Sequence, residues 1–272
     1  MGAADRWARD LAEWAIPPEI QAQASASPWE FPPGAFERRA DRASQARTPS
    51  DRVAMAALPE RGGVLDVGCG AGAASLPLAR RAGLLAGVDV DARLLNEFRT
   101  RAERTGVDVI AIEGRWPEAA DRAPVVDVAV CHHVAYNVPG LPAFVRRLTE
   151  HARVRVVLEL TTVHPRAYLN HLWLHFHGLR RPSRPTADDA ERVLREAGLA
   201  PHRENWMPAE PNTSFASIEE AVLWTGRAIC LPAARLPELR SMIEPDLSTV
   251  DGVVTQPPRP RATFWWPGTA GR

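Results

Sequence analysis

Short runs of apolar, often β-branched residues alternate along the chain with stretches of helical hydrophobic periodicity. Five runs are predicted strands, over residues 64–67, 85–90, 107–112, 125–131 and 154–160. Amphipathic helices are predicted between them, over 73–81, 92–105 and 141–151. This alternation is typical of βαβ units, in which helices cover both faces of a parallel sheet. The pattern therefore predicts an α/β fold.

The chain on either side of this repeat follows a different pattern. Residues 3–14 place Trp7, Leu11 and Trp14 on one helical face, and Thr48-Pro49 is a typical helix start. We expect residues 1–60 to form a helical cap or lid and 61–272 to form the main domain, with a helical insertion over 164–185. Further helices are predicted over 165–177, 186–198 and 217–229, and further strands over 202–206 and 261–266.

Composition narrows the class of protein. Acidic and basic residues balance at 33 each, so the chain carries no electrostatic footprint for nucleic acid. No run of about 18 apolar residues occurs, and no apolar segment follows the charged N-terminus, so neither a membrane helix nor a secretory signal is expected. Three widely spaced cysteines predict no disulfide framework, which favours a cytoplasmic location.

A glycine-rich segment, Gly68-Cys69-Gly70-Ala71-Gly72, directly follows the first predicted strand. Ligands of open parallel sheets bind beyond the carboxyl ends of the strands, so this turn is the expected site. Read as Gly-x-Gly-x-x-Ala, the segment also fits the dinucleotide fingerprint of a nicotinamide oxidoreductase. Asp66 argues against that reading, because a carboxylate repels a pyrophosphate but suits an ammonium group. Asp89, at the end of the second strand, suits the ribose of either ligand.

With these residues the chain resembles the class I S-adenosylmethionine-dependent methyltransferases. The resemblance is carried by the segments 65–72, 87–89 and 126–134, and it covers roughly residues 61–160. It implies a Rossmann-like, seven-stranded, mostly parallel sheet with helices on both faces. The strand over 261–266 would be the antiparallel last strand, and S-adenosyl-L-methionine would be the cofactor.

The resemblance also implies which residues hold the cofactor. Asp89 would bind the ribose and Val90 would lie against the adenine. An acid that often contacts the adenine amino group is replaced here by Arg115, so a backbone N–H and stacking on Trp116 are expected instead. The methionine end would be bordered by Asp66, Gly68, Cys69, Gly70, Gly72, Cys131 and His132.

Candidates for a general base stand near the ends of the fourth and fifth strands. A base helps when the methyl acceptor is a hydroxyl or a protonated amine. Each candidate also has a structural alternative: a histidine packed under the sheet edge, a wall tyrosine, or a buried carboxylate paired with an arginine. The catalytic candidates are His132, His133, Tyr136, Glu159 and His164.

The helix over 165–177 is rich in histidine. His171 and His175 are four residues apart, so one helix face could present both to a metal. The interleaved Trp173, Leu174 and Phe176 favour an aromatic cap over a pocket, and no metal is predicted.

The sequence as a whole predicts methyl transfer to an O or N atom of a small-molecule acceptor, with the insertion over 164–185 forming part of the acceptor pocket. An RNA methyltransferase is one alternative, although the segment after the fourth strand lacks the Asn/Asp-Pro-Pro-aromatic motif. A non-catalytic relative that only binds the cofactor is another.

Overall fold

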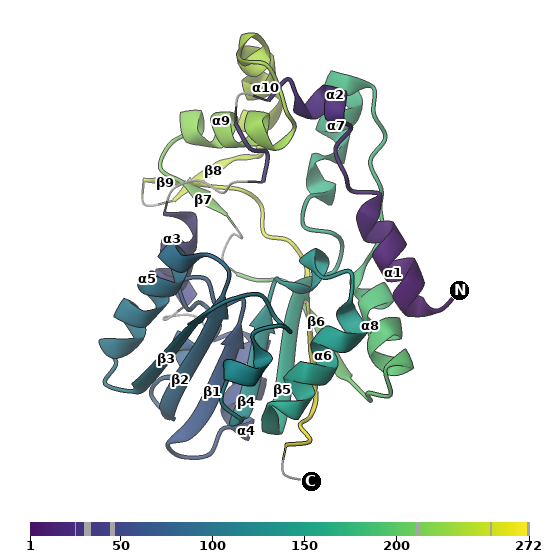
Figure 1. Ribbon diagram of the computed structural model, residues 1–272. Helices are drawn as coiled ribbons and strands as arrows, with labels where there is room; N and C mark the ends of the chain where they lie inside the picture. The colour runs from purple at the N-terminus through teal and green to yellow at the C-terminus, as the bar shows by residue number, and fades with distance from the viewer. Residues whose placement is uncertain (25, 30–33, 44–46, 210–212, 251, 271–272) are drawn as a thin grey trace.

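The computed structural model describes residues 1–24, 26–29, 34–43, 47–209, 213–250 and 252–270. Its centre is a sheet of seven strands in the order β3-β2-β1-β4-β5-β10-β6 (Figure 1). β1 pairs parallel with β2 and β4, whereas β10 runs antiparallel to both β5 and β6. The predicted sheet, with its antiparallel last strand, is therefore confirmed. The strands are β1 (Gly62–Val67), β2 (Ala82–Asp89), β3 (Asp108–Glu113), β4 (Val126–His132), β5 (Ala152–Thr161), β6 (His202–Trp206) and β10 (Arg261–Pro267).

Helices cover both faces of this sheet, and the alternation of side chains along each strand supplies both cores. In β4, Ala129 and Cys131 face the cluster that includes Trp7 and Phe144, whereas Val128 and Val130 face the cluster of Phe98. The first cluster lies under α1 (Ala3–Ala12), α6 (Leu141–Glu150) and α8 (Ala187–Glu196). The second lies under α4 (Pro49–Ala57) and α5 (Ala92–Glu103).

Helix α4 begins at the predicted helix start, and the structure shows a capping box there. The Thr48 side chain accepts a hydrogen bond from the backbone N–H of Asp51 at 3.1 Å, and the Asp51 carboxylate accepts one from Thr48 N–H at 2.9 Å. Val53 and Ala54 then join the hydrophobic cluster of the sheet. A domain boundary at residue 60 stays a prediction, and α4 itself packs with the sheet.

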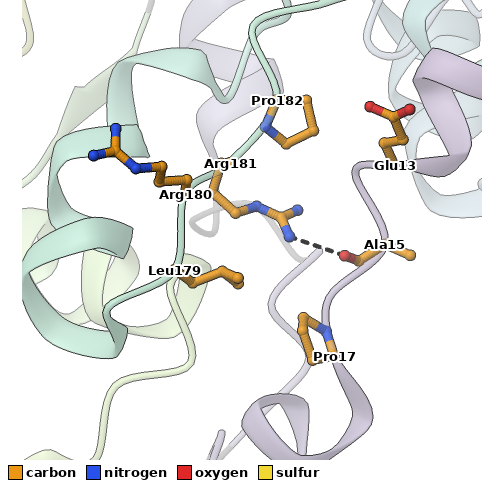
Figure 2. A pocket seen from close by; sticks show the side chains of 7 residues that line it. All are labelled: Glu13, Ala15, Pro17, Leu179, Arg180, Arg181 and Pro182. Atoms are coloured by element: carbon orange, nitrogen blue, oxygen red, sulfur yellow. Dashed lines mark hydrogen bonds between the residues drawn. The ribbon is translucent and has the colours of Figure 1, made fainter.

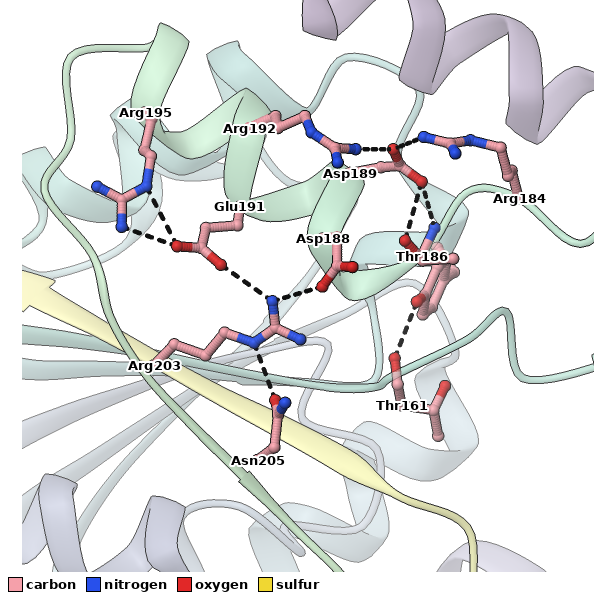
Figure 3. A network of polar contacts seen from close by, with 11 residues as sticks. Thr161, Arg184, Thr186, Asp188, Asp189, Glu191, Arg192, Arg195, Arg203 and Asn205 are labelled. Carbon is pink, nitrogen blue, oxygen red and sulfur yellow. Dashed lines mark hydrogen bonds and ion pairs between the residues drawn. The ribbon is translucent and has the colours of Figure 1, made fainter.

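Helix α8 is anchored by a network of ion pairs (Figure 3). Arg203, on β6, donates to Asp188 at 2.6 Å and to Glu191 at 3.0 Å. Asp189 accepts hydrogen bonds from Thr186 N–H at 2.8 Å and from Arg192 at 2.7 Å. The network connects the outermost strand to the helix that covers it.

A second group of elements forms a cap beyond the carboxyl ends of the strands, in the upper part of Figure 1. Leu172, Phe176, Val222 and Leu239 contribute to its own hydrophobic cluster. The helices predicted over 165–177 and 217–229 are confirmed, the first with an initial 3-10 turn over Ala167–Leu169. The cap contains α2 (Pro18–Gln21), α7 (Asn170–His177), α9 (Ile218–Ala228), α10 (Leu236–Ile243) and a small sheet of β7 (Ser214–Phe215), β8 (Ser248–Val250) and β9 (Val253–Thr255). No helix among the described residues is long and apolar enough to cross a membrane.

One predicted helix is wrong. Residues 73–81 form turns with a 3-10 segment over Leu76–Leu78 in place of an α-helix. Leu78 N–H bonds to Ser75 O and Ala79 N–H to Leu76 O, so the spacing is three residues. Pro77 has no N–H to donate, and the chain must enter β2 at Ala82, so a longer α-helix does not form here.

Candidate functional site

The glycine loop after β1 lies where the strand order reverses, between β1 and β4. Gly68, Gly70 and Gly72 all adopt positive φ, at 71°, 51° and 95°. A side chain at Gly68 would place its Cβ 2.3 Å from Cγ2 of Val134. Glycine is therefore required both by the backbone conformation and by the close approach of the segment after β4.

Two carboxylates flank this loop. Asp66 is fully buried in β1, and its Oδ2 accepts a hydrogen bond from Ser75 Oγ at 2.6 Å. Asp89, at the end of β2, accepts hydrogen bonds from Gly70 N–H at 2.8 Å and from Asp91 N–H at 2.9 Å. Two main-chain donors thus orient the Asp89 carboxylate beside the loop.

The residues expected near the adenine are placed differently from one another. Val90, directly after β2, is 58% exposed although it is apolar, and Arg115 is exposed. Trp116 is buried, and its indole N–H donates to the carbonyl oxygen of Phe144 on α6 at 3.2 Å. Val90 and Arg115 therefore remain accessible at this edge, while Trp116 packs into the core beneath it.

Cys69, within the loop, and Cys131, in β4, are buried thiols. Burial raises the pKa of both thiols well above the usual value, and the charge of Asp66 raises it further. Both residues therefore act as small neutral side chains that shape the site.

Helix α3 (Ala35–Ala43), which the sequence reasoning missed, lies beside the glycine loop. The Phe36 ring is the nearest group to a Cβ built on Gly70, at 3.4 Å. Glu37 pairs with Arg93 on α5 at 2.5 Å, and Arg38 donates to the Ser214 carbonyl of the small sheet at 3.1 Å. The signal for this helix was an amphipathic run rich in charged residues between two prolines and Thr48.

Glu159, near the carboxyl end of β5, is the centre of a second polar cluster. It is 1% exposed and accepts hydrogen bonds from Ser50 Oγ at 2.6 Å and from Arg261 Nη1 at 2.9 Å. His133 Nε2 lies 2.9 Å from Oε1 of the same carboxylate, and His132 Nδ1 lies 3.9 Å from Oε2. Burial alone would raise the pKa of Glu159, but the two histidines and Arg261 hold it well below its usual value. Glu159 is thus a buried, ionised carboxylate.

Five elements bring this cluster together: α4, β4, β5, β6 and β10. His133 follows β4 with a left-handed φ of 62°, and Thr263 of β10 pairs with Glu159 across the sheet. Ser50, in the first turn of α4, also contacts Thr263 at 2.7 Å between the hydroxyl oxygens, and Trp206 Nε1 donates to Thr263 at 2.9 Å. The sequence reasoning found Glu159 and the histidines, but Ser50, Arg261 and Thr263 carried no motif that would mark them.

Asp51 lies at the rim of this cluster. Burial raises its pKa to about 6, the hydrogen bonds from Thr48 oppose the rise, and the negative charge of Glu159 adds to it. Ser50 and Asp51 are neighbours in the chain. Ser50 stabilises the negative charge of Glu159, whereas that charge disfavours ionisation of the Asp51 carboxyl group.

Tyr136 is placed away from Glu159. Its hydroxyl donates to the Thr161 carbonyl at 2.8 Å and its ring stacks on Trp7, with 5.5 Å between ring centroids. Burial raises its pKa far above the usual value. In this position Tyr136 is a hydrogen-bonded wall residue.

His164 belongs to the same aromatic stack. Its ring lies parallel to Trp14 with 3.7 Å between centroids, and its Nδ1 accepts a hydrogen bond from Arg166 N–H at 3.2 Å. Burial, together with the charges of Arg166 and Arg181, lowers its pKa to about 3. The imidazole is therefore neutral, and the five candidate base residues divide into the Glu159 cluster and this stack.

The histidines of α7 connect the helices of the cap. His175 Nε2 contacts Glu238 of α10 at 2.7 Å, and His177 Nε2 contacts the Ile229 carbonyl at 2.7 Å. In the described part of the chain, no three His, Cys, Asp or Glu side chains form a group that could hold a metal ion.

An open hollow of about 400 Å³ lies between residues 13–17 and 179–182 (Figure 2). Figure 2 shows Arg181 crossing it to the Ala15 carbonyl, to which its Nη1 donates at 2.9 Å. None of the residues of the glycine loop or of the Glu159 cluster lines this hollow.

The sheet order, the glycine loop and the acidic residue at the end of β2 are together those of a class I methyltransferase domain. Residues 38–204, more than half of the chain, match the model of a protein family whose description is "Methyltransferase domain". The chain belongs to this family. The predicted family and its cofactor, S-adenosylmethionine, are thereby confirmed.

Individual relatives are similar over shorter segments. A ubiquinone biosynthesis O-methyltransferase of Azorhizobium caulinodans is 31% identical over 100 residues, which is 37% of this chain and 40% of the relative. A ribosomal protein L11 methyltransferase of Dechloromonas aromatica is 36% identical over 84 residues, which is 30% of this chain and 28% of the relative. The matches thus span less than half the length of these curated relatives.

Solved structures confirm the fold. The crystal structure of a putative methyltransferase from Bacillus halodurans is similar with a TM-score of 0.53 and 18% identity, and the match covers 80% of this chain and 96% of that one. The uncovered part of this chain corresponds to a fifth of its length.

Proposed function

We propose that this protein transfers a methyl group from S-adenosylmethionine to an oxygen or nitrogen atom of a small molecule. The observation that carries the proposal is the buried contact between Glu159 and His133, at the same edge of the sheet as the glycine loop. A carboxylate that orients an imidazole is an arrangement suited to removing a proton. Hydroxyl and ammonium acceptors need that removal before or during methyl transfer.

The glycine loop and the residues around it are proposed to bind the cofactor. Asp89, already oriented by two main-chain N–H groups, accepts hydrogen bonds from the ribose hydroxyls. Val90 offers its exposed apolar side chain to the adenine, with Arg115 beside it, and Trp116 supports this loop from the core. The methionine end is proposed to lie against Asp66, Gly68, Cys69, Gly70, Gly72, Cys131 and His132.

The Glu159 cluster is proposed to act on the methyl acceptor. When bound, S-adenosylmethionine would supply the electrophilic methyl group and would leave as S-adenosylhomocysteine. His133 takes the proton of the acceptor, and the Glu159 carboxylate stabilises the imidazolium that results. Ser50 and Arg261 hold that carboxylate in place. General base catalysis of this kind contributes roughly 10²- to 10⁴-fold in rate.

Two features support a small acceptor. The cap lies beyond the carboxyl ends of the strands, where it covers the region that the acceptor must enter (Figure 1). The similarity to ubiquinone biosynthesis O-methyltransferases supports a hydroxyl acceptor in particular. We also propose a cytoplasmic location, since the three cysteines are free, buried thiols.

A macromolecular acceptor is the second candidate. The similarity to a ribosomal protein L11 methyltransferase favours a protein over an RNA, and the balanced charge of the chain also argues against RNA. A non-catalytic relative would bind the cofactor and methylate none of these.

One experiment separates these readings. The purified protein is titrated with S-adenosylhomocysteine by calorimetry and then incubated with methyl-labelled S-adenosylmethionine and cell extract, from which small-molecule, protein and RNA fractions are counted. We expect heat of binding and label in the small-molecule fraction. The label should disappear with His133→Gln and persist with His175→Gln, a matched control in which the histidine pairs with Glu238 on the cap. Binding without label in any fraction would contradict the proposed activity.

A further inference from the structure

Arg259, in the segment between the small sheet and β10, differs from the arginines that form ion pairs. Arg203, Arg235 and Arg240 each contact carboxylates. Among the described residues, no carboxylate lies within 4.0 Å of Arg259, and its Nη1 makes a long contact of 3.5 Å to Gln256 Oε1. Its Nε is buried without a hydrogen-bond partner. The Nε–H of this guanidinium therefore has no acceptor among the described residues, and its Nη1 has only a long contact.

The plane of this guanidinium is nevertheless fixed. Its central carbon lies 4.0 Å from the centroid of the Tyr168 ring, which holds the group by a cation–π contact. Burial raises the pKa of Tyr168, and the charge of Arg259 opposes that rise. A guanidinium held flat with its donors unpaired is preorganised to bind a planar or tetrahedral oxyanion.

A second half-buried arginine, Arg166, lies close enough to Tyr168 for its charge to lower the pKa of that tyrosine. Its guanidinium donates to the carbonyl oxygens of Pro28 at 2.7 Å and Ala228 at 3.4 Å and stacks over Trp29 at 4.4 Å. In the described part of the chain it too has no carboxylate partner. Arg166 thus adds a positive charge near Tyr168 that no described carboxylate neutralises.

A comparison with Arg181 shows that this arrangement is not general to the cap. Arg181 also lacks a described carboxylate, but both of its terminal nitrogens donate to the carbonyls of Trp14 and Ala15. The donors of Arg181 therefore bind the N-terminal segment next to α7. Among the described residues, Arg259 donates to no main-chain carbonyl in this way.

Arg259 lies close along the chain to the proposed reaction centre. It precedes by two residues Arg261, which binds Glu159, and the intervening Pro260 carbonyl accepts a hydrogen bond from Thr162 at the end of β5. Two residues in extended chain span about 7 Å. The backbone of Arg259 therefore lies within about 7 Å of the backbone of the residue that binds Glu159.

We propose that Arg259, reinforced by the charge of Arg166, binds an oxyanion of the methyl acceptor, either a carboxylate or a phosphate. That the bound molecule is the methyl acceptor rests on the proposed function. An unpaired guanidinium that is partly removed from water is costly, and an oxyanion offsets that cost by bidentate, charge-assisted hydrogen bonds. The Tyr168 and Trp29 rings on either side would accommodate an aromatic or otherwise apolar body.

The test uses three probes of similar shape on the full chain saturated with S-adenosylhomocysteine, which occupies the cofactor's own carboxylate site. Benzoate, phenyl phosphate and neutral benzamide are titrated, with ligand-observed NMR as the readout. We expect an anionic probe to bind in the millimolar range and benzamide to bind at least about 10-fold more weakly, which corresponds to about 1.4 kcal/mol. Preference for benzoate or for phenyl phosphate identifies the oxyanion.

Variants decide whether Arg259 is responsible. Arg259→Gln should weaken anion binding at least about 10-fold, and Arg259→Lys, which keeps the charge but not the fork, should be intermediate. Arg235→Gln is the matched control, because Arg235 stacks on Phe176 at 4.5 Å but is paired with Glu238. Equal binding of all three probes, or anion binding unchanged in folded Arg259→Gln, would overturn the proposal. Failure to bind S-adenosylhomocysteine would instead count against the proposed function.

Discussion

The glycine loop between β1 and β2 and the Glu159 cluster across β4, β5 and β10 lie at the same edge of one sheet, yet they are assembled differently. The loop contacts join residues close in sequence: Ser75 to Asp66 is a separation of 9 residues, and Gly70 to Asp89 one of 19. The cluster contacts join distant residues: Ser50 and Glu159 are 109 apart, and Ser50 and Thr263 are 213 apart.

The two regions also differ in what fixes their shape. Main-chain N–H groups and positive φ angles fix the loop, so its form depends on glycines and on one carboxylate. The cluster is fixed by a buried charge that needs its partners, because a buried carboxylate is costly when unpaired. Substitutions in the loop should therefore change cofactor affinity, while substitutions in the cluster should change the chemical step.

The largest expected effect comes from His133→Gln. Loss of the proposed base should lower kcat by roughly 10²- to 10⁴-fold. The affinity for S-adenosylhomocysteine should stay within about threefold, because the contacts of the loop are untouched. Single-turnover assays with the acceptor found in the extract, together with calorimetry, measure both quantities. A fall in cofactor affinity as large as the fall in rate would remove the distinction between the two regions.

Asp89→Asn, beside the glycine loop, should have the opposite effect: it should weaken cofactor binding. It keeps an oxygen for Gly70 or Asp91 N–H but removes the charge that the ribose hydroxyls require. Charge-assisted hydrogen bonds contribute about 1.5 to 3 kcal/mol, so affinity for S-adenosylhomocysteine should fall by roughly 10- to 100-fold. Asp108→Asn, on an exposed carboxylate of β3, is the control and should leave affinity unchanged. Calorimetric affinity equal to wild type in Asp89→Asn would disprove the ribose assignment.

The same difference explains how much of the site the sequence could predict. The loop has a local signature, since Asp66, the glycines and Asp89 fall within 24 consecutive residues. The five strands of the alternating repeat followed from apolar runs of ordinary length, whereas their order in the sheet was not predicted. The helix predicted over 73–81 failed because a single proline and a short return to β2 outweighed its amphipathic pattern.

The cluster and the cap were predictable only in part. Glu159 was recognisable as a carboxylate within an apolar strand, but its partners Ser50 and Arg261 come from a helix cap and an antiparallel strand that carry no motif. Strands of two or three residues, such as β7 and β8, are too short to show a period. Contacts between residues this far apart are set by tertiary packing, and no local pattern records them.

The smallest expected effect concerns His164, which lies on the opposite side of β5 from Glu159. Its pKa is about 3 in the folded chain, against 6.5 for an ordinary histidine, so between these values the unfolded chain binds more protons. Stability should therefore fall as pH decreases below about 6.5, with a loss of about 1 kcal/mol between pH 7 and 5.5 from this residue.

His164→Phe, which preserves stacking on Trp14, should remove that part of the pH dependence. Urea denaturation at the two pH values measures it, with His202→Phe as the control because His202 also stacks on a tryptophan but is exposed. An identical loss in wild type and His164→Phe would show that His164 is not buried as a neutral ring, and the separation of the aromatic stack from the Glu159 cluster would have to be abandoned.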